Sequence, residues 1–545
     1  MSDTTSKNKD GAQNPQAMQQ NGGATPPQNG NLAEWTIIIY IAADSNLANF
    51  AIESLKQLNA TANDQVKVAV QFAVDAPGGQ KIPRYIFDGC PDQKPCPDRP
   101  ISASLDSFLD APKNMTEQEA LTSLLHWVFY EKKRHNKDTT AKYYALILWG
   151  HGPELLFEPP SGRIPTNPCG DPGDDNNGLF LTPIELRDAL KKGLRPDPNL
   201  CDASQHTDSD TKKPHIDVIG FDACSMALLE VAYEIRGSVD FMIASQEEVP
   251  DLSFPYDRLV SYIMSLQGKM PEELCENLIK MYGTTYQDYI CNANTGMKKV
   301  TLSAIRLKHL CVLKDALARL AHLLYCARHE PGLPDLLIDC RARAKGFAGG
   351  LYVDIFSFCD KLRAALVIPP IPKEMAQVIS DVCVDVCNAL LLPEDEEHNN
   401  NNCILANLAS DTSECHGLSI YFPYMKNEEV EEIRQPLVKG GTDTVGKGFA
   451  AIMNRVAANT LQSIRRGLVL DTEAYYADLF LAIDTCWYEF IAKVWTRVLT
   501  RRVPTELDLR YSAQQAAVNL LKKVNCTNKL CPENSSAEAG ADNKD

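Results

Sequence analysis

Residues 35–43 read WTIIIYIAA, an apolar and largely β-branched run that ends at the polar residues Asp44, Ser45 and Asn46. Such a run is typical of a strand that is buried on both faces, as the strands of parallel sheets are. Further runs of this kind follow in the first half of the chain, and segments with helical periodicity separate several of them. The predicted strands are 35–43, 66–74, 84–87, 143–149, 215–221 and 239–244, and the predicted helices are 47–58, 116–130 and 225–236.

Strands that alternate with helices predict a parallel sheet covered on both faces, so we expect an α/β fold, an α/β/α sandwich with a mostly parallel sheet. The second half of the chain differs, because helical periodicity dominates at 308–327 and 374–392. We therefore expect a mainly helical C-terminal domain whose strand-like pieces can join the main sheet. The expected organisation is a disordered tail at 1–33, an α/β domain at 34–300, the C-terminal domain at 301–523 and a disordered tail at 524–545.

Composition excludes several classes of protein. The chain has 545 residues, of which 44% are hydrophobic and 23% charged, so collagen-like and wholly disordered chains are excluded. With a formal net charge of −17, the chain as a whole lacks the excess of basic residues that is typical of nucleic-acid-binding proteins. No apolar run approaches the roughly 18 residues that suggest a membrane span. The first residues lack the apolar segment of a secretory signal, so the sequence predicts a cytoplasmic protein if residue 1 is its natural start.

Two strand ends carry residues that are capable of nucleophilic catalysis. Strand 143–149 runs into Gly-His-Gly, and strand 215–221 is followed by Asp-Ala-Cys-Ser. If the strands are parallel neighbours, His151 and Cys224 emerge at the same edge, where open α/β sheets bind ligands. The imidazole can take the thiol proton, and a helix beginning at Ser225 would favour the thiolate through its dipole. Taken singly, each residue is more often a packing or turn residue, so the pairing of the two strand ends carries the prediction.

Several segments, taken in order, resemble the clostripain family of cysteine peptidases, within the wider superfamily of caspases, legumains and gingipains. The resemblance covers about residue 34 to at least residue 425. The matching segments are WTIIIYIAADSNL (35–47), YYALILWGHG (143–152), NNGLFLTPIELRDAL (176–190), IDVIGFDACSMALLEVAYEI (216–235), ASQEEVPDLSFPYDRLV (244–260) and HGLSIYFP (416–423).

The resemblance implies a caspase-like fold and a cysteine endopeptidase that cleaves after Arg or Lys through a thioacyl-enzyme. It implies that His151 and Cys224 form the catalytic dyad, and that the backbone N–H groups of Gly152 and Cys224 form the oxyanion hole. It also implies that Asp222 lines the pocket for the basic side chain, where a carboxylate pairs well with a guanidinium. The alternative role for Asp222 is to cap the following helix.

A second pocket acid often comes from the loop after the fifth long strand in this family. Glu248 and Asp251 are the expected candidates, with Glu247 beside them. The alternative is that these acids are simply solvated loop charges.

Relatives are commonly made as zymogens and processed by self-cleavage after a basic residue in the loop that follows the histidine. Arg163, in the Gly- and Pro-rich loop 152–178, is the expected processing site, with Lys191, Lys192, Lys212 and Lys213 as the alternatives. We expect no required cofactor and no metal ligands. Calcium, which some relatives need, stays open: the acidic stretch Asp171–Asp175 could hold it or be simply solvated, and the sequence has no EF-hand-like string.

The expected partners are peptide or protein substrates with basic residues, and neither nucleic acid nor a membrane. A catalytically inactive, caspase-like binding scaffold is the first alternative, and the presence of His151, Cys224 and Asp222 together argues against it. A thiol redox or thioester-transfer enzyme is the second. It would need a resolving cysteine or a cofactor motif, and the sequence contains neither a CxxC pair nor a Gly-rich phosphate loop.

Overall fold

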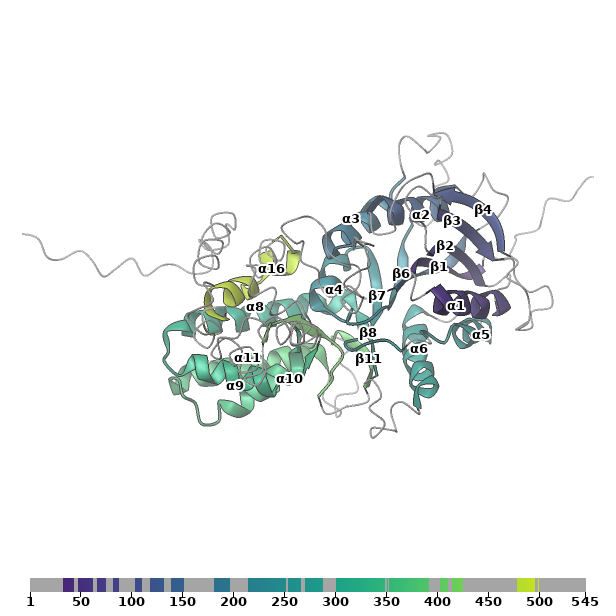
Figure 1. Cartoon of the computed structure of the whole chain (residues 1–545). Coiled ribbons are helices and arrows are strands. Elements are labelled where there is room, and N and C mark those ends of the chain that lie inside the picture. Colours follow the sequence, from purple (N-terminus) through teal and green to yellow (C-terminus); the bar gives the residue numbers. More distant parts are fainter. Residues whose placement is uncertain are drawn as a thin grey trace, which may run out of the picture. The chain divides into compact units, whose positions relative to one another are not determined.

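Figure 1 shows the computed structural model of the chain, in which helices and strands alternate through the first half. The first described residue is Ala33, the start of the first strand. The structure describes residues 33–43, 48–61, 66–74, 82–87, 103–109, 118–131, 139–150, 181–196, 214–250, 253–265, 270–287, 300–347, 350, 352–391, 402–409, 414–424, 478–495 and 498.

The framework is a nine-stranded sheet whose five central strands are parallel. Two antiparallel strands lie at each end of this parallel part. In order across the sheet, the strands are β11 (Ile404–Ala409), β8 (Thr301–Arg306), β7 (Val239–Ala244), β6 (Ile216–Asp222), β5 (Ala141–Gly150), β1 (Ala33–Ala43), β2 (Val66–Val74), β3 (Ile82–Phe87) and β4 (Ala103–Leu109).

Helices cover both faces of the sheet, because the side chains of a strand alternate between the two faces. In β1, Trp35, Ile37, Ile39 and Ile41 belong to one buried cluster, whereas Ile38 and Tyr40 belong to the other. The first cluster includes α1 (Ala48–Thr61), α5 (Tyr256–Ser265) and α6 (Pro271–Thr285). The second includes α2 (Gln118–Tyr130), α3 (Pro183–Gly193) and α4 (Leu229–Ile235). The predicted α/β/α sandwich is confirmed, and its parallel part is the centre of the sheet.

The C-terminal part of the chain is mainly helical among its described residues, as predicted. It also contains a three-stranded antiparallel sheet of β12 (Ser419–Tyr421), β10 (Tyr352–Asp354) and β9 (Gly346–Phe347). Its helices are η4 (Leu307–His309), α8 (Leu310–Cys326), η5 (Ala327–His329), α9 (Leu333–Arg343), α10 (Ile355–Ala365), α11 (Lys373–Leu390), α16 (Phe480–Asp484), α17 (Trp487–Glu489) and the π-helical turn η7 (Phe490–Trp495).

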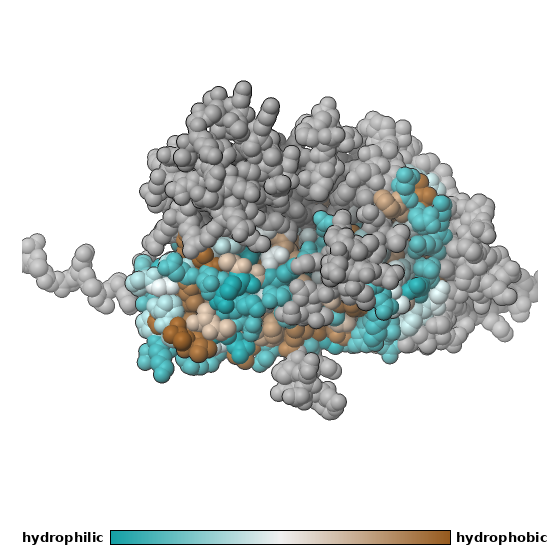
Figure 2. All heavy atoms as spheres, turned by 60° about the horizontal axis from the view of Figure 1, so that its bottom comes forward, coloured by the Kyte–Doolittle hydropathy of each residue, from teal (hydrophilic) through white to brown (hydrophobic). Residues whose placement is uncertain are grey.

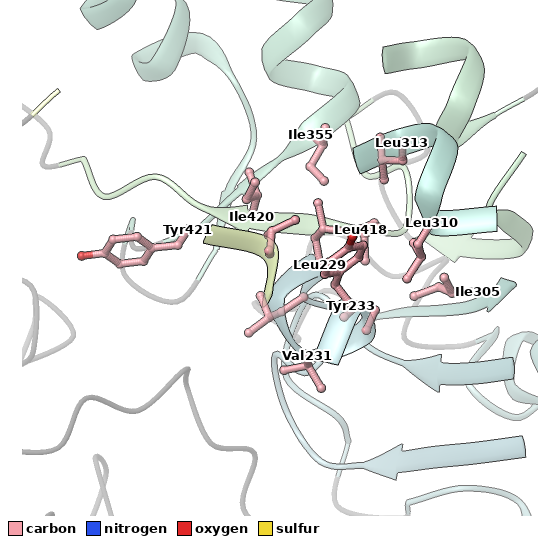
Figure 3. Close-up of a cluster of buried hydrophobic side chains, with 14 of the residues drawn as sticks. Leu229, Val231, Tyr233, Ile305, Leu310, Leu313, Ile355, Leu418, Ile420 and Tyr421 are labelled. Carbon is pink, nitrogen blue, oxygen red and sulfur yellow. The ribbon is translucent and has the colours of Figure 1, made fainter. Parts of the chain in front are cut away.

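The C-terminal elements share a core with the main sheet. Figure 3 shows the buried cluster that includes Leu229 and Val231 of α4, Ile305 of β8, Leu310 and Leu313 of α8, and Ile420 of β12. Two of the C-terminal strands, β8 and β11, also belong to the nine-stranded sheet. The boundary expected near residue 300 therefore falls between two neighbouring strands of one sheet, β7 and β8.

Hydrophilic residues predominate over the described part of the face in Figure 2, with smaller hydrophobic patches between them. The most exposed large apolar side chains among the described residues are Val367 and Ile368. In the part of the chain that the structure describes, no helix has the length and apolar character needed to cross a membrane.

Segment 478–495 is held against the small sheet by aromatic packing and two hydrogen bonds. The indole N–H of Trp487 donates to the Tyr421 carbonyl at 3.0 Å, and that of Trp495 donates to the Pro423 carbonyl at 2.6 Å. The ring of Phe422 lies between the two indoles, with centroid distances of 5.5 Å and 4.5 Å. Aromatic pairs of this kind add to the stabilisation that comes from burial of their surface.

We predict that Trp487→Ala lowers the free energy of unfolding by about 3–5 kcal/mol, the usual cost of truncating a buried aromatic side chain. Chemical denaturation followed by intrinsic fluorescence measures the change. Val367→Ala is the control, since the Val367 side chain is exposed and its truncation leaves no cavity. Equal unfolding midpoints for the two variants would show that segment 478–495 contributes little to stability.

Candidate functional site

The candidate site lies at the carboxyl ends of β5 and β6, next to the point where the strand order reverses. The chain runs outward from β1 to β2 on one side, and from β5 through β6 to β7 on the other. Clefts at such a reversal are where open α/β sheets bind ligands. Trp149 of β5 is paired in register with Asp222 of β6, so the residues that follow both strands emerge together.

The last residue of β5, Gly150, allows a close approach to β1. A Cβ atom at this position would lie 2.7 Å from the carbonyl oxygen of Ala42, which real Cβ atoms do not tolerate. Glycine is therefore required for β5 to pass β1 where the chain leaves the sheet. His151 and Gly152, the predicted dyad histidine and oxyanion donor, come next and lie outside the described residues.

Cys224 lies two residues beyond β6 and is partly exposed. Its Sγ accepts a hydrogen bond from the backbone N–H of Val249 at 3.3 Å. Val249 belongs to the segment that follows β7, the strand beside β6. A hydrogen bond to sulfur favours the thiolate over the thiol, and the thiolate is the nucleophilic form.

The prediction that a helix begins at Ser225 is wrong, because α4 begins at Leu229. Ser225 has a φ of 55°, in the left-handed region, and its N–H donates to the carbonyl of Glu247 at 3.0 Å. The N–H of Ala227 donates to Ser245 at 2.9 Å. These backbone groups are paired with the segment after β7 rather than with a helical turn. Cys224 is therefore not at a helix N-terminus, so the expected helix dipole does not act on its sulfur.

Asp222 is buried, with 3% of its surface exposed, and its Oδ2 atom is held by hydrogen bonds. The Tyr256 hydroxyl donates to Oδ2 at 2.6 Å, and the Phe254 N–H donates at 3.2 Å. Both donors come from the end of the loop after β7 and the start of α5, so Asp222 does not cap α4. The other carboxylate oxygen, Oδ1, is buried and has no hydrogen-bond partner among the described residues.

Burial is the main influence on the ionisation of Asp222. It raises the pKa of this carboxyl from 3.8 to about 6, although hydrogen bonds from Tyr256, Phe254 and Ser253 favour the charged form. Burial and the neighbouring Asp222 also raise the pKa of Tyr256 well above its usual value, so this phenol stays a donor. The site thus holds a carboxylate that is costly to keep charged without a cation.

Ser253 connects the surroundings of Asp222. Its hydroxyl accepts from the indole N–H of Trp149 at 2.9 Å, and its carbonyl accepts from the Tyr286 hydroxyl at 2.6 Å. Ser253 has a φ of 62° and, with Ser225, is one of two described residues other than glycine in the left-handed region. Each such conformation costs on the order of 1–3 kcal/mol, and both occur at this site. Sequence reasoning missed Ser253 and Tyr256 as partners, because no spacing rule connects them to Asp222.

The acids considered for the second pocket position differ in their surroundings. Glu247 forms an ion pair with Lys345 of the C-terminal part at 2.9 Å, and Glu248 is exposed. Asp251 lies outside the described residues, as do Arg163 and the acidic stretch 171–175.

Among the described residues, one group of side chains could hold a metal ion. It consists of His215, Asp217 and Asp240, whose ligand atoms all lie within 4.8 Å of one another. These residues lie at the amino ends of β6 and β7, at the opposite edge of the sheet from Cys224. His215 is paired with Asp240 at 2.9 Å, and Asp217 accepts the Tyr144 N–H at 2.7 Å.

Comparison with solved structures finds cysteine proteases of low sequence identity. A secreted C11 cysteine protease from Bacteroides thetaiotaomicron, in complex with an irreversible peptide inhibitor, is 17% identical, with a TM-score of 0.45; the match covers 72% of this chain and 94% of that one. An inactive zymogen C11 protease from Parabacteroides distasonis is 16% identical, with a TM-score of 0.45; that match covers 75% and 97%.

No curated protein matches the sequence. The family model of the clostripain family, in contrast, matches residues 39–345, which is more than half of the chain. The matched region includes both strand ends of the candidate site and the whole surroundings of Asp222. The resemblance found in the sequence is thereby confirmed, and the protein belongs to the clostripain family of cysteine peptidases.

Proposed function

We propose that the protein is an endopeptidase that cleaves after Arg or Lys, with Cys224 as the nucleophile and His151 as its general base. The observation that carries the specificity is the buried Oδ1 atom of Asp222, which has no partner among the described residues. A substrate guanidinium or ammonium would supply both the hydrogen bond and the positive charge that this carboxylate lacks.

The reaction has two halves. The Cys224 thiolate attacks the scissile carbonyl carbon, and backbone N–H groups of Gly152 and Cys224 stabilise the resulting oxyanion. Collapse of this intermediate breaks the C–N bond, and protonated His151 gives its proton to the leaving amine. Water then attacks the thioester with His151 as base, releasing the carboxylic acid and regenerating the thiol.

The position of Asp222 supports its assignment to the pocket. It lies two residues before Cys224, and it is buried among aromatic residues that include Phe254 and Tyr256. An aromatic, water-poor environment strengthens a charge pair once the substrate cation is bound. Glu248 and Asp251, which follow β7 in the sequence, stand as further candidates for contact with the substrate.

The first test is hydrolysis of fluorogenic peptides that end in Arg, Lys or Asp, with and without calcium. The wild-type protein should cleave after Arg and Lys, and Cys224→Ala should abolish cleavage. Asp222→Asn should lower kcat/KM for the Arg peptide on the order of 100-fold, because the substrate loses its counter-charge. Absence of cleavage by wild-type protein, also after limited nicking of loop 152–178 by trypsin, would favour the inactive scaffold.

A second test uses the pKa of Asp222, which is about 6. Since only the charged carboxylate attracts the substrate cation, kcat/KM for Arg peptides should fall as the pH falls through 6. Tyr256→Phe removes a donor that favours the charged form, so it should move this acid limb to higher pH by about half a unit to one unit.

Tyr282→Phe is the matched control for this pH profile. The Tyr282 hydroxyl is buried on the same side of the sheet but has no hydrogen-bond partner among the described residues. Its removal should leave the acid limb in place. Equal acid limbs in the two variants would mean that Asp222 does not control the pH dependence.

We also propose that the protein activates itself by cleavage after Arg163. Mass spectrometry of purified wild-type protein should show two fragments that meet at this bond, whereas Cys224→Ala and Arg163→Gln should stay intact there. Lys192→Gln is the control, because Lys192 lies in the last turn of α3 and should not be a cleavage site. Identical intact masses for wild-type and Cys224→Ala protein would contradict self-cleavage.

A further inference from the structure

The segment Ser245–Val249 determines where the thiol of Cys224 lies. At one end, its Val249 N–H donates to Sγ. Its carbonyl groups at Ser245 and Glu247 accept the N–H groups of Ala227 and Ser225, which follow Cys224 in the chain. The segment is therefore bonded to the sulfur of Cys224 and to the backbone just after it, and a shift of the segment would move both the sulfur and its donor.

Thr301, the first residue of β8, fixes the backbone of this segment. Its side chain is buried, and its Oγ1 accepts the N–H groups of Gln246 and Glu247, both at 3.0 Å. The same Oγ1 is hydrogen-bonded to the hydroxyl of Ser245 at 2.8 Å. One hydroxyl thus accepts from two consecutive backbone donors, of which the Glu247 N–H is shared with the Ser245 hydroxyl at 3.2 Å. These bonds fix the turn directly after β7.

The Gln246 side chain continues this network into the small sheet. It is buried, and its Nε2 donates to Asp354 at 3.0 Å and to the Ser419 hydroxyl at 2.8 Å. Its Oε1 accepts the N–H of Gly417 at 2.9 Å. The carbonyl and both amide hydrogens are therefore all used, by residues more than 100 positions away in the sequence.

Asp354 anchors the far end of the network. Besides Gln246, it accepts the N–H of Ser357 at 2.8 Å and both the N–H and the Nδ1 of His416, at 2.7 Å and 3.0 Å. The His416 ring stacks on Phe356 with centroids 4.1 Å apart. Figure 3 shows Ile355, which follows Asp354, and Leu418, two residues after His416, within the buried cluster that contains Leu229 of α4.

We propose that Thr301, Gln246 and Asp354 form a positioning network through which the C-terminal part holds the Val249 N–H against the Cys224 sulfur. The network rests on the proposed function, because it matters for catalysis only if Cys224 is the nucleophile. Buried polar groups that are all hydrogen-bonded have few alternative arrangements, so they keep their neighbours in one geometry. A donor held at 3.3 Å from sulfur stabilises the thiolate before any substrate binds.

The test measures the Cys224 thiolate directly, without peptide substrate. Wild-type protein, Thr301→Val and Thr301→Ser are alkylated with iodoacetamide over a range of pH, and the Cys224 peptide is quantified by mass spectrometry. Valine has nearly the shape of threonine but lacks the acceptor, whereas serine keeps it. Thr301→Val should shift the alkylation profile upward by about one pH unit, equivalent to about 1.4 kcal/mol. Thr301→Ser should stay near the wild-type profile.

Cys311 is an internal control, because this exposed thiol on α8 belongs to the same molecule but lies outside the network. Its profile should be the same in all variants. Peptide hydrolysis by Thr301→Val should show a lower kcat as its main effect, since Asp222 of the pocket is held by Tyr256 and Phe254 rather than by the network. An unmoved Cys224 profile in a Thr301→Val protein that melts near the wild-type temperature would overturn the proposal.

Gln246→Leu provides the second variant, and it tests the positioning network if Thr301→Val does not fold. It removes the bonds to Asp354, Ser419 and Gly417 but leaves the Thr301 hydroxyl in place. A raised Cys224 profile supports the network, and a wild-type profile contradicts it. These readings are independent of the proposed cleavage activity, so wild-type protein that alkylates as expected but cleaves nothing would contradict only the proposed function.

Discussion

The parallel pairing of β5 with β6 is the constraint on which the site depends. Parallel strands end at the same edge of a sheet, so the register that places Trp149 beside Asp222 also brings the residues after both strands to one place. The neighbouring parallel strand, β7, then delivers the segment that contacts Cys224. Thus, Cys224, the backbone donor at its sulfur and the buried Asp222 are brought together by adjacent strands. The apolar side chains on both faces make this register costly to change, because a shift by one residue would move every side chain to the other face.

The environment of Asp222 shows how the fold retains an unfavourable group. A carboxylate with 3% exposure and one unpartnered oxygen lowers stability, and the raised pKa expresses that cost. Because the folded-state pKa lies above that of the unfolded chain, the contribution of Asp222 to stability is greatest at low pH and is lost as the pH rises through about 6. Tyr256 and the Phe254 N–H reduce the cost without removing it. Perturbed carboxyl groups of this kind are typical of functional sites, where a ligand supplies the missing partner.

Sequence patterns located most elements because strong periodicity and burial agree with local preference. The strands predicted at 66–74 and 239–244 have the observed bounds of β2 and β7. The helix predicted from Ser225 failed for a physical reason: the backbone donors of Ser225 and Ala227 find acceptors on the segment after β7, and these tertiary bonds replace a first helical turn. Likewise, the interaction of Tyr256 and Ser253 with Asp222 has no local signal, because it joins residues about 30 positions apart through the packing of α5 against the sheet.

The sequence by itself determined the class of fold, the strand ends that carry Cys224 and Asp222, and the family. Apolar β-branched runs, helical periodicity and the order of a few segments are sufficient for these, since each is a local property of the chain. Only the tertiary structure decided what surrounds those residues: the Val249 N–H at the sulfur, the unpartnered oxygen of Asp222, and the network from Thr301 to Asp354. Such contacts depend on the geometry with which distant segments pack. Buried hydrogen bonds form only where donor and acceptor lie within a few tenths of an ångström of their usual separation of about 2.9 Å.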